Sequence, residues 1–395
     1  MQRAVGGVGT DAGEFLDAAR GIAGCIAAAG EEIDATRRLP QAVVEALLDA
    51  GLFRLALPRS VGGVEIDLPG YLNVAEEVAR ADGSTGWCLV QGSLSASQVV
   101  ASLRPEVARE IFGPPGRAIM ANGTGTGGTA VPVPGGYRLS GSWPFASGCT
   151  HATWFKAAAQ VQGGDGEAAP GGAPEVRTLL FPAAAEYLVD VWQVSGLRGT
   201  GSHTITVRDV FVPRERTLAL ARDPKRERGP LYRVPYAGMA AAGFSAVAMG
   251  IARGALDAFI ALGRSKLSRG APHLLRDDAV IQAQVALAEA QLRAARAFLH
   301  ETARAVWSTV QAGGELDNGE RALFRLSATH GIHQAAQVVD TVYGAAGATA
   351  IFSAHGFERR FRDVHAVTQQ TQARPMHFQA VGRYFLGLDM ESTYV

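Results

Sequence analysis

The pattern of apolar residues changes along the chain from helical to alternating and back to helical. In the first part, apolar residues recur at helical spacing. Pro40 and Gly51 bracket one such segment, as a first-turn proline and a residue just past the helix end. The sequence Asp82-Gly83-Ser84-Thr85 predicts the N-terminal cap of a further helix that begins near Trp87. We therefore expect helices throughout this first part.

From about residue 118 to residue 213 the pattern is typical of strands and turns, which favours a small β-barrel or sandwich. Residues 163–174, rich in Gly, Ala and Pro, are expected to form a flexible surface loop. Helical spacing then returns, and Gly344 is expected at the end of the last long helix. The strand candidates are Tyr137–Trp143, Thr153–Val161, Arg177–Pro182 and His203–Val212, and the long helix candidates are Ile281–Thr309 and Leu323–Val342.

The composition narrows the classes of function. Of 395 residues, 47% are apolar and 19% are charged, which excludes a wholly disordered chain. Lys+Arg and Asp+Glu both count 37, so no net field attracts a polyanion and nucleic-acid binding is disfavoured. The three cysteines stand far apart without C-x-x-C spacing. This predicts neither disulfides nor a zinc site, and with no recognisable secretory signal it favours a cytoplasmic setting.

One apolar segment, Pro235–Ala252, has 18 residues without a charge and is long enough for a membrane span. Its content is mostly Ala and Gly, which transfer weakly into lipid, and Arg253 and Asp257 follow directly. We therefore expect a helix buried in a bundle and no membrane association.

The segment Gly123–Gly128 matches G-x-G-x-x-G, the pattern of dinucleotide-binding loops. A dinucleotide site needs a helix after this loop, whereas here strand and turn residues follow. We therefore expect no nicotinamide-binding domain in this chain.

The C-terminal part carries the most informative motif. A small-residue patch, Tyr343–Ala348, is followed by the charged run Glu358-Arg359-Arg360-Phe361-Arg362-Asp363. Together they resemble the cofactor-binding end of the acyl-CoA dehydrogenase fold, and the order helical, β, helical matches that fold from end to end. The resemblance implies an α+β fold with an N-terminal helical domain (1–116), a central β-barrel domain (117–220) and a C-terminal four-helix bundle (221–395).

Two positions separate this chain from dehydrogenases of that fold. Their catalytic Glu commonly lies nine residues after the Arg of the R-D pair, and here that residue is Thr371. Some members place a Glu in the helix after the β-block, but residues 229–249 contain neither Asp nor Glu. The resemblance therefore points to the branch that uses reduced flavin and oxygen, the two-component (group D) monooxygenases.

The pattern S-G-x-x-H-A-x-W, here Ser147 to Trp154, is similar to that of the reduced-flavin aromatic hydroxylases. The resemblance implies that Phe145 and Ser147 contact the flavin and that the Ser147 hydroxyl bonds the flavin N5-H, which slows loss of hydrogen peroxide. It also makes His151 a catalytic candidate. A strand end with buried aromatic residues and a structural histidine explains the same residues without any function.

Two further motifs carry weaker signals. Gly196–Thr204 recurs in dehydrogenases and oxygenases of the fold, which implies that Arg198 and Thr200 contact the cofactor, although a Gly-rich hairpin is the simpler interpretation. The phrase A-D-G-S-T-x-W, ending at Trp87, resembles the oxygenase branch, whose next helix lines the substrate pocket. Trp87, Gln91 and Ser93 are therefore candidate substrate contacts, while a helix cap with a core Trp explains the same pattern.

In the oxygenase branch the run R-D-x-H-A-x-x-Q usually precedes a His that acts on the substrate as base or orienter. Here Gln370 occupies that position. An amide takes no proton at neutral pH, so Gln370 is expected either to tune substrate choice or only to pack at a helix end. His365 is a further candidate substrate contact. The resemblance also assigns a set of residues to the cofactor and no residue to a metal; the set is Asn122, Arg264, Gly344 and Gly347.

These motifs favour the oxygenase component of a two-component flavin-dependent monooxygenase. A separate reductase would supply FMNH2 or FADH2, and oxygen would react through a C4a-hydroperoxyflavin to hydroxylate carbon or nitrogen of a small aromatic or amine-bearing molecule. The resemblance also implies a homotetramer, a dimer of dimers in which a neighbouring subunit completes the flavin site. Two alternatives stay open: an acyl-CoA dehydrogenase with a relocated base, and a non-catalytic flavin-fold binding protein.

Overall fold

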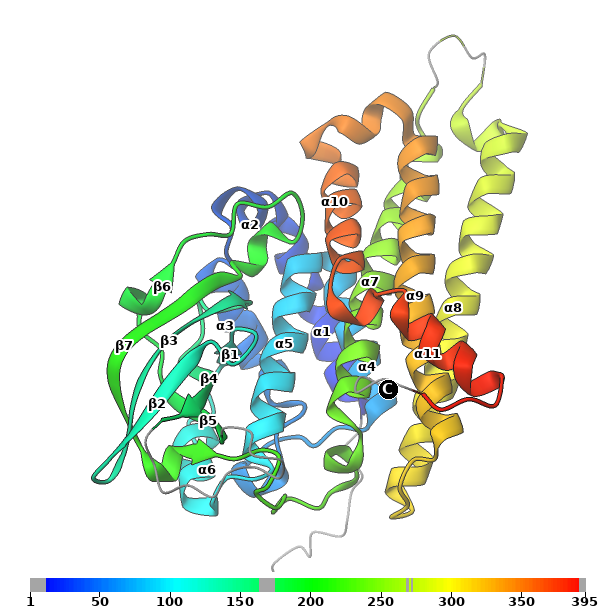
Figure 1. The fold of residues 1–395 in the computed structure, drawn as a ribbon. Helices are drawn as coiled ribbons and strands as arrows, with labels where there is room; N and C mark the ends of the chain where they lie inside the picture. The colour runs from blue at the N-terminus through cyan, green and yellow to red at the C-terminus, as the bar shows by residue number, and fades with distance from the viewer. Residues whose placement is uncertain (1–11, 163–174, 268–269, 271–272, 391–395) are drawn as a thin grey trace, which may run out of the picture.

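The computed structural model describes residues 12–162, 175–267, 270 and 273–390, so the loop expected over 163–174 lies outside the described residues. The chain builds a helical region, then a sheet, then a bundle of long helices (Figure 1). The helices of the first region are α1 (Ala12–Ala28), α2 (Gly30–Thr36), α3 (Gln41–Asp49), α4 (Leu68–Ala81), α5 (Gly83–Val100) and α6 (Pro105–Phe112).

The predicted helix signals in this region are confirmed. Pro40 directly precedes α3, and Gly51 follows it with a φ of 68°, a left-handed conformation that favours glycine. The Asp82 carboxylate caps α5 by accepting a hydrogen bond from the Thr85 N–H at 2.8 Å. This cap fixes the start of the helix whose first turns carry Trp87.

The central region is one eight-stranded sheet with the order β6-β7-β3-β2-β4-β5-β8, and β1 pairs with β4. The predicted central β domain between two helical regions is confirmed, with β6 and β8 at the two ends of the strand order among the described residues. The strands are β1 (Met120–Asn122), β2 (Gly128–Val133), β3 (Gly136–Ala146), β4 (Trp154–Val161), β5 (Val176–Pro182), β6 (Leu188–Val189), β7 (His203–Pro213) and β8 (Thr217–Leu218).

Trp143 of β3 is fully buried in the sheet and explains the first and last glycines of the G-x-G-x-x-G pattern, Gly123 and Gly128. A Cβ on Gly123 would lie 2.5 Å from the Trp143 side chain, and one on Gly128 would lie 2.3 Å from its ring. Strand β2 follows the pattern directly, as predicted. These glycines therefore let the backbone pack closely against a tryptophan.

The third region contains α7 (Tyr236–Gly263), α8 (Ala279–Gln311), α9 (Asn318–Ala346), α10 (Phe357–Thr368) and α11 (Met376–Phe385), of which α7 to α10 form the four-helix bundle (Figure 1). By length and composition α7 could cross a membrane, but 67% of its apolar window is buried inside the fold. Helix α9 continues past the predicted end at Val342, because Tyr343 to Ala346 are compatible with a helix, and Gly347 ends it with a φ of 55°.

Helix α5 lies between the sheet and the bundle (Figure 1). On the bundle side it packs tightly on α7, where a Cβ on Gly243 would lie 2.9 Å from the Val90 side chain. On the sheet side its polar residues contact Asn122 of β1. Helix α5 is therefore the wall that the sheet and the bundle share, and the candidate site is built around it.

Candidate active site

Ser147, directly after β3, belongs to a chain of hydrogen-bonded hydroxyl groups. Its Oγ accepts a hydrogen bond from Trp87 Nε1 at 3.0 Å and lies 2.7 Å from Ser202 Oγ. The Ser202 hydroxyl lies 2.7 Å from Thr200 Oγ1, which donates to the Leu197 carbonyl oxygen at 2.8 Å. Ser147 is 8% exposed, and Ser202 and Thr200 are more deeply buried. Three segments far apart in sequence thus meet at one hydroxyl.

The direction of every bond in this chain follows from the fact that a hydroxyl has one proton. A carbonyl oxygen only accepts, so the Thr200 proton is committed to Leu197. Ser202 must then donate to Thr200, and Ser147 must donate to Ser202. Because Ser147 Oγ also accepts from Trp87, one of its two lone pairs remains. The site therefore presents a hydrogen-bond acceptor of fixed orientation.

Phe145, two residues before Ser147, offers a flat apolar surface in a strained position. Its φ is 59°, which is unusual for a bulky residue and costs about 1–3 kcal/mol. Its side chain is 59% exposed, and its ring meets Trp192 edge-on at 6.0 Å. The structure thus holds an aromatic ring in solvent next to the Ser147 acceptor.

Helix α5 supplies one wall of the site. The Trp87 indole stacks on Phe244 of α7 with ring centroids 4.1 Å apart. One helical turn later, Gln91 Nε2 donates to Asn122 Oδ1 at 3.2 Å, and Asn122 also accepts from Ser95. Predicted contacts Trp87, Gln91 and Asn122 are therefore brought to one side of α5.

Ser93 is a different case among the residues predicted on α5. It is 1% exposed and lies beside the buried Tyr71 hydroxyl on α4. Two residues along a helix correspond to a rotation of about 200°, so Ser93 faces away from Gln91 and into the helical core.

His151 lies in the turn after Ser147, against Gly148 and with its ring 6.3 Å from that of Phe53. Neither ring nitrogen has a hydrogen-bond partner among the residues that the structure describes. Burial lowers the pKa of His151 to about 4, so the ring is neutral at physiological pH. It is a weak base that can offer one N–H and one lone pair.

The loop that carries Thr200 is clamped from two sides. Arg198 Nε donates to the Asp34 carbonyl oxygen at 3.0 Å, and its Nη1 donates to Val194 O at 3.0 Å. Arg362 of α10 contacts both Asp34 carboxylate oxygens at 3.1 Å and also binds the Ser195 carbonyl. Arg198 therefore holds its own loop against α2 through main-chain oxygens.

Asp363 fixes the same loop at Leu197, whose N–H donates to Asp363 Oδ1 at 2.6 Å. Asp363 is 2% exposed, and burial, followed by the neighbouring Asp82 carboxylate, raises its pKa to about 7. Gly196 allows this contact, because a Cβ there would lie 2.0 Å from the Arg362 carbonyl oxygen. The R-D pair of the charged run thus positions the hydroxyl chain through the Leu197 peptide.

Gln370 lies between α10 and α11, at the start of the short 3-10 turn Thr371–Ala373 beside α7 (Figure 1). Its Oε1 accepts from the Gln372 N–H at 2.8 Å and so caps that turn. Its Nε2 is buried without a hydrogen-bond partner in the described part of the chain. Gln370 therefore has a packing role through its oxygen and an unused donor on its nitrogen.

The remaining predicted residues lie elsewhere on the bundle. His365 of α10 meets Asp340 Oδ1 of α9 at 2.8 Å and packs on Phe361. Arg264 follows the end of α7, and near it Lys266 Nζ donates to the Ala346 carbonyl at the end of α9, where Gly344 and Gly347 lie. Arg264 is 20 residues beyond Phe244 on α7, or about 30 Å along the helix axis. Arg264, Gly344 and Gly347 are therefore remote from Ser147 within this chain, and His365 is held by Asp340 and Phe361.

The sequence analysis did not single out Phe244, Ser95 or the anchoring role of Asp363. Phe244 gave no signal, because an aromatic residue in an apolar helix is most simply a core residue. Its contact with Trp87 depends on how α5 and α7 pack together.

Comparison with known proteins identifies the family. Residues 11–113 match the family model described as Acyl-CoA dehydrogenase, N-terminal domain, and residues 242–375 match Acyl-CoA dehydrogenase, C-terminal domain. Indole-3-acetate monooxygenase of Pseudomonas putida is 32% identical over 358 residues, covering 90% of this chain and 89% of the relative. The flavin-dependent monooxygenase oxygenase subunit HsaA of Mycobacterium tuberculosis is 31% identical over 339 residues, 84% of each chain.

Among solved structures, XiaF from Streptomyces sp., in complex with FADH2 and glycerol, superposes with a TM-score of 0.87 at 25% identity and covers 97% of this chain and 98% of its own. These relatives support the monooxygenase interpretation over the dehydrogenase alternative. The chain therefore belongs to the flavin-dependent monooxygenases with the acyl-CoA dehydrogenase fold, as an oxygenase component that uses reduced flavin from a separate reductase.

Proposed function

We propose that this protein hydroxylates an aromatic small molecule whose ring is itself a good nucleophile, such as an indole or an arylamine. The observation that carries the proposal is the acceptor of fixed direction on Ser147, held beside the exposed ring of Phe145. Relatives named for aromatic substrates, indole-3-acetate and resorcinol, support the aromatic class.

The residues around Ser147 fit a reduced flavin. The reduced ring system has an apolar dimethylbenzene part and carries an N–H at N5, so it can use an apolar surface next to a hydrogen-bond acceptor. Phe145 supplies the surface, and the unused lone pair of Ser147 Oγ supplies the acceptor. When bound, reduced flavin provides the electrons with which O2 places one oxygen atom on the substrate and releases the other as water.

The protein's own groups would orient reactants and exclude water, and neither of the two candidate proton acceptors, His151 and Gln370, is a strong base. Gln370 carries an amide, and burial keeps His151 neutral with a pKa of about 4. A phenol needs a base to become a strong nucleophile, whereas an indole or arylamine does not. The absence of a carboxylate or ordinary histidine at these two positions therefore favours the second class of substrate.

We further propose that the active form is a homotetramer, a dimer of dimers. The cofactor residues predicted near Arg264 and Gly347 lie about 30 Å along α7 from Phe244, so a single flavin meets both groups only if they come from different subunits. Apolar side chains exposed at two bundle sites support such contacts; they are Val280, Leu287, Ile351 and Phe352. The free thiols of Cys25, Cys88 and Cys149 support a cytoplasmic location.

The proposal is tested by anaerobic titration with reduced FMN and reduced FAD, followed by oxygen and a panel of indoles, arylamines and phenols. We expect tight binding of one reduced flavin and hydroxylation of indoles or arylamines in preference to phenols. Failure to bind either reduced flavin, or dye reduction with an acyl-CoA instead, would contradict it.

A further inference from the structure

Helix α5 keeps a strip of accessible surface along one face. Trp87, Gln91 and Gln98 are its partly exposed residues, and the rest of the helix is buried. At about 100° per residue, Gln91 and Gln98 lie within about 40° of Trp87 around the helix axis. The axial rise from Trp87 to Gln98 is about 16 Å. An accessible strip of that length therefore follows α5.

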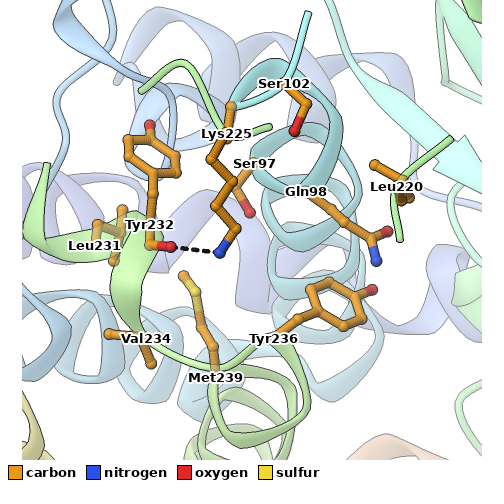
Figure 2. Close-up of a pocket in the computed structure, with 11 residues that line it drawn as sticks. Ser97, Gln98, Ser102, Leu220, Lys225, Leu231, Tyr232, Val234, Tyr236 and Met239 are labelled. Atoms are coloured by element: carbon orange, nitrogen blue, oxygen red, sulfur yellow. Dashed lines mark hydrogen bonds between the residues drawn. The ribbon is translucent and has the colours of Figure 1, made fainter. Parts of the chain in front are cut away.

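The two ends of this strip differ in what lies beside them. At the first end, Trp87 contacts Ser147 and Phe244, the centre of the proposed reaction. At the second end, Gln98 borders a pocket of about 220 Å³ between α5, the segment after β8 and the start of α7 (Figure 2). Tyr236, which also lines the pocket, precedes Phe244 by eight residues, or about 12 Å on α7. Both helices thus place the pocket 12–16 Å from the reaction centre, by the same approximate helix rise.

The pocket is lined by hydrogen-bond donors and one cation. Figure 2 shows the Lys225 side chain pointing into the pocket, where its Nζ donates to the Tyr232 carbonyl oxygen at 2.5 Å. An ammonium group has three protons, so two remain for another partner. The hydroxyl groups of Ser97, Ser102 and Tyr236 line the same space.

No carboxylate balances this cation. The lining contains neither Asp nor Glu, and among the residues that the structure describes none of the carboxylates lies within 4.0 Å of Lys225 Nζ. Partial burial lowers the pKa of Lys225, as expected for an ammonium group without a counter-charge.

A second lysine lies behind the pocket wall. Lys156 of β4 is 5% exposed, and its Nζ donates to Gln98 Oε1 at 2.7 Å and to the Ser95 carbonyl oxygen at 3.3 Å. Because the Gln98 Oε1 already accepts a hydrogen bond from Lys156, the NH2 group of this amide is the part that can donate to a bound ligand. Burial lowers the pKa of Lys156 to about 7, so this lysine is only partly charged at neutral pH. What the wall adds on the same side as Lys225 is therefore the Gln98 donor.

We propose that this pocket binds the anionic end, a carboxylate or similar acid group, of an elongated substrate whose ring lies beside Ser147. The assignment rests on the proposed oxygenase function and adds the shape and charge of the substrate. A cavity of about 150 Å³ holds a benzene ring, so the pocket has room for an acid group and a short part of its chain but not for the three-ring flavin.

The test uses the full-length protein with reduced FMN, kept anaerobic, and ω-phenylalkanoic acids from phenylacetic to phenyldecanoic acid. Each acid is compared with its primary amide by calorimetric titration. Acids long enough to reach from the reaction centre to the pocket are expected to bind about tenfold more tightly than their amides, because only the carboxylate forms an ion pair with Lys225. Phenylacetic acid is too short and should show no such preference.

Lys225→Met is expected to abolish the preference for long acids. Arg226→Met removes the same charge from the next, exposed residue and should leave the preference intact. Equal binding of long acids and amides by the unmodified protein, or a preserved preference in Lys225→Met, would overturn the assignment. The assignment would also be overturned if Lys225→Met lost binding of reduced FMN but still bound reduced riboflavin. Because the two flavins differ only by the phosphate, that result would mean that the pocket holds the flavin phosphate.

A separate activity measurement distinguishes a failure of the pocket assignment from a failure of the proposed function. Hydroxylation of an indole or arylamine without an acid tail should proceed with the same kcat in the parent protein and in Arg226→Met, since Arg226 does not line the pocket. Such activity without any acid preference would overturn only the pocket assignment. No oxygenation of any aromatic compound would count against the proposed function itself.

Discussion

Replacing Ser147 with Ala removes the acceptor on which the proposed function depends. The hydroxyl accepts from Trp87 Nε1, donates to Ser202 and keeps one lone pair, which in the proposed function would accept from the flavin N5-H. The variant retains Phe145, Arg198 and the loop clamp, so reduced flavin should still bind. It would lose the hydrogen bond that, in the proposed function, retains the N5 proton and suppresses release of hydrogen peroxide.

The expected size of the effect follows from the hydrogen bond that is lost. Leaving a buried donor without its acceptor costs about 1–3 kcal/mol. If that cost appears fully in the barrier to peroxide release, the release rate rises by about 5- to 150-fold. Trp87 and Ser202 also lose their shared partner, so the free energy of unfolding should fall by a comparable amount.

The assay is the rate of hydrogen peroxide release from protein, reduced flavin and oxygen without substrate. Ser202→Ala preserves the Ser147 acceptor but frees its proton to reorient, so it should give a smaller increase. Ser142→Ala is the matched control, because Ser142 lies on β3, the strand that directly precedes Ser147, is exposed, and pairs with Thr206 at 3.0 Å outside the site. An unchanged rate in Ser147→Ala, with flavin bound, would refute the reasoning.

Three other changes test the remaining interpretations. Gln370→His should improve turnover of phenols and introduce a pH dependence near 6–7, the approximate range of histidine pKa values; identical substrate and pH profiles would leave Gln370 a packing residue. The pKa of Asp363 is raised to about 7, so the folded state binds the proton more tightly and stability is lost as pH rises from about 4 towards 7. Asp363→Asn should flatten this fall in melting temperature between about pH 5 and 8, and an unaltered pH slope would contradict the shift. Light scattering should give four times the chain mass of 41.3 kDa, and a monomer at micromolar concentration would count decisively against the tetramer.

The architecture could be predicted from the sequence because the local signals for helices and strands agreed over long segments. Helical spacing, the Asp82 cap and the Gly51 stop are set by neighbouring residues, and each appears where it was expected. The end of α9 was predicted too early, because Gly344 looked like a stop signal, whereas Gly347 provides the left-handed residue. Whether the sheet closes depends on pairing between strands distant in sequence, which local patterns do not encode.

The candidate site could be predicted less well, because its contacts join segments that are distant in the sequence. Ser147 was found through a motif, but its partner Trp87 lies 60 residues away and the two were assigned different roles. Lys225 and Lys156 gave no signal, since an isolated lysine in a loop or strand is ordinarily a surface residue. Only the packing of α5 against the sheet and α7 reveals that one is buried and the other points into a pocket.

The charged run Glu358–Asp363, which identified the fold, affects the candidate site indirectly, by holding a loop. Arg362 and Asp363 hold the loop around Leu197, and that loop carries the carbonyl oxygen at which the hydroxyl chain ends. Since each proton in the chain is directed by the next acceptor, fixing the Leu197 peptide fixes the free lone pair of Ser147 three hydroxyl groups away. A signature shared by dehydrogenases and oxygenases is therefore compatible with both chemistries. In the proposed function it would orient an acceptor for the flavin, and the choice of reaction would then depend on other residues of the site.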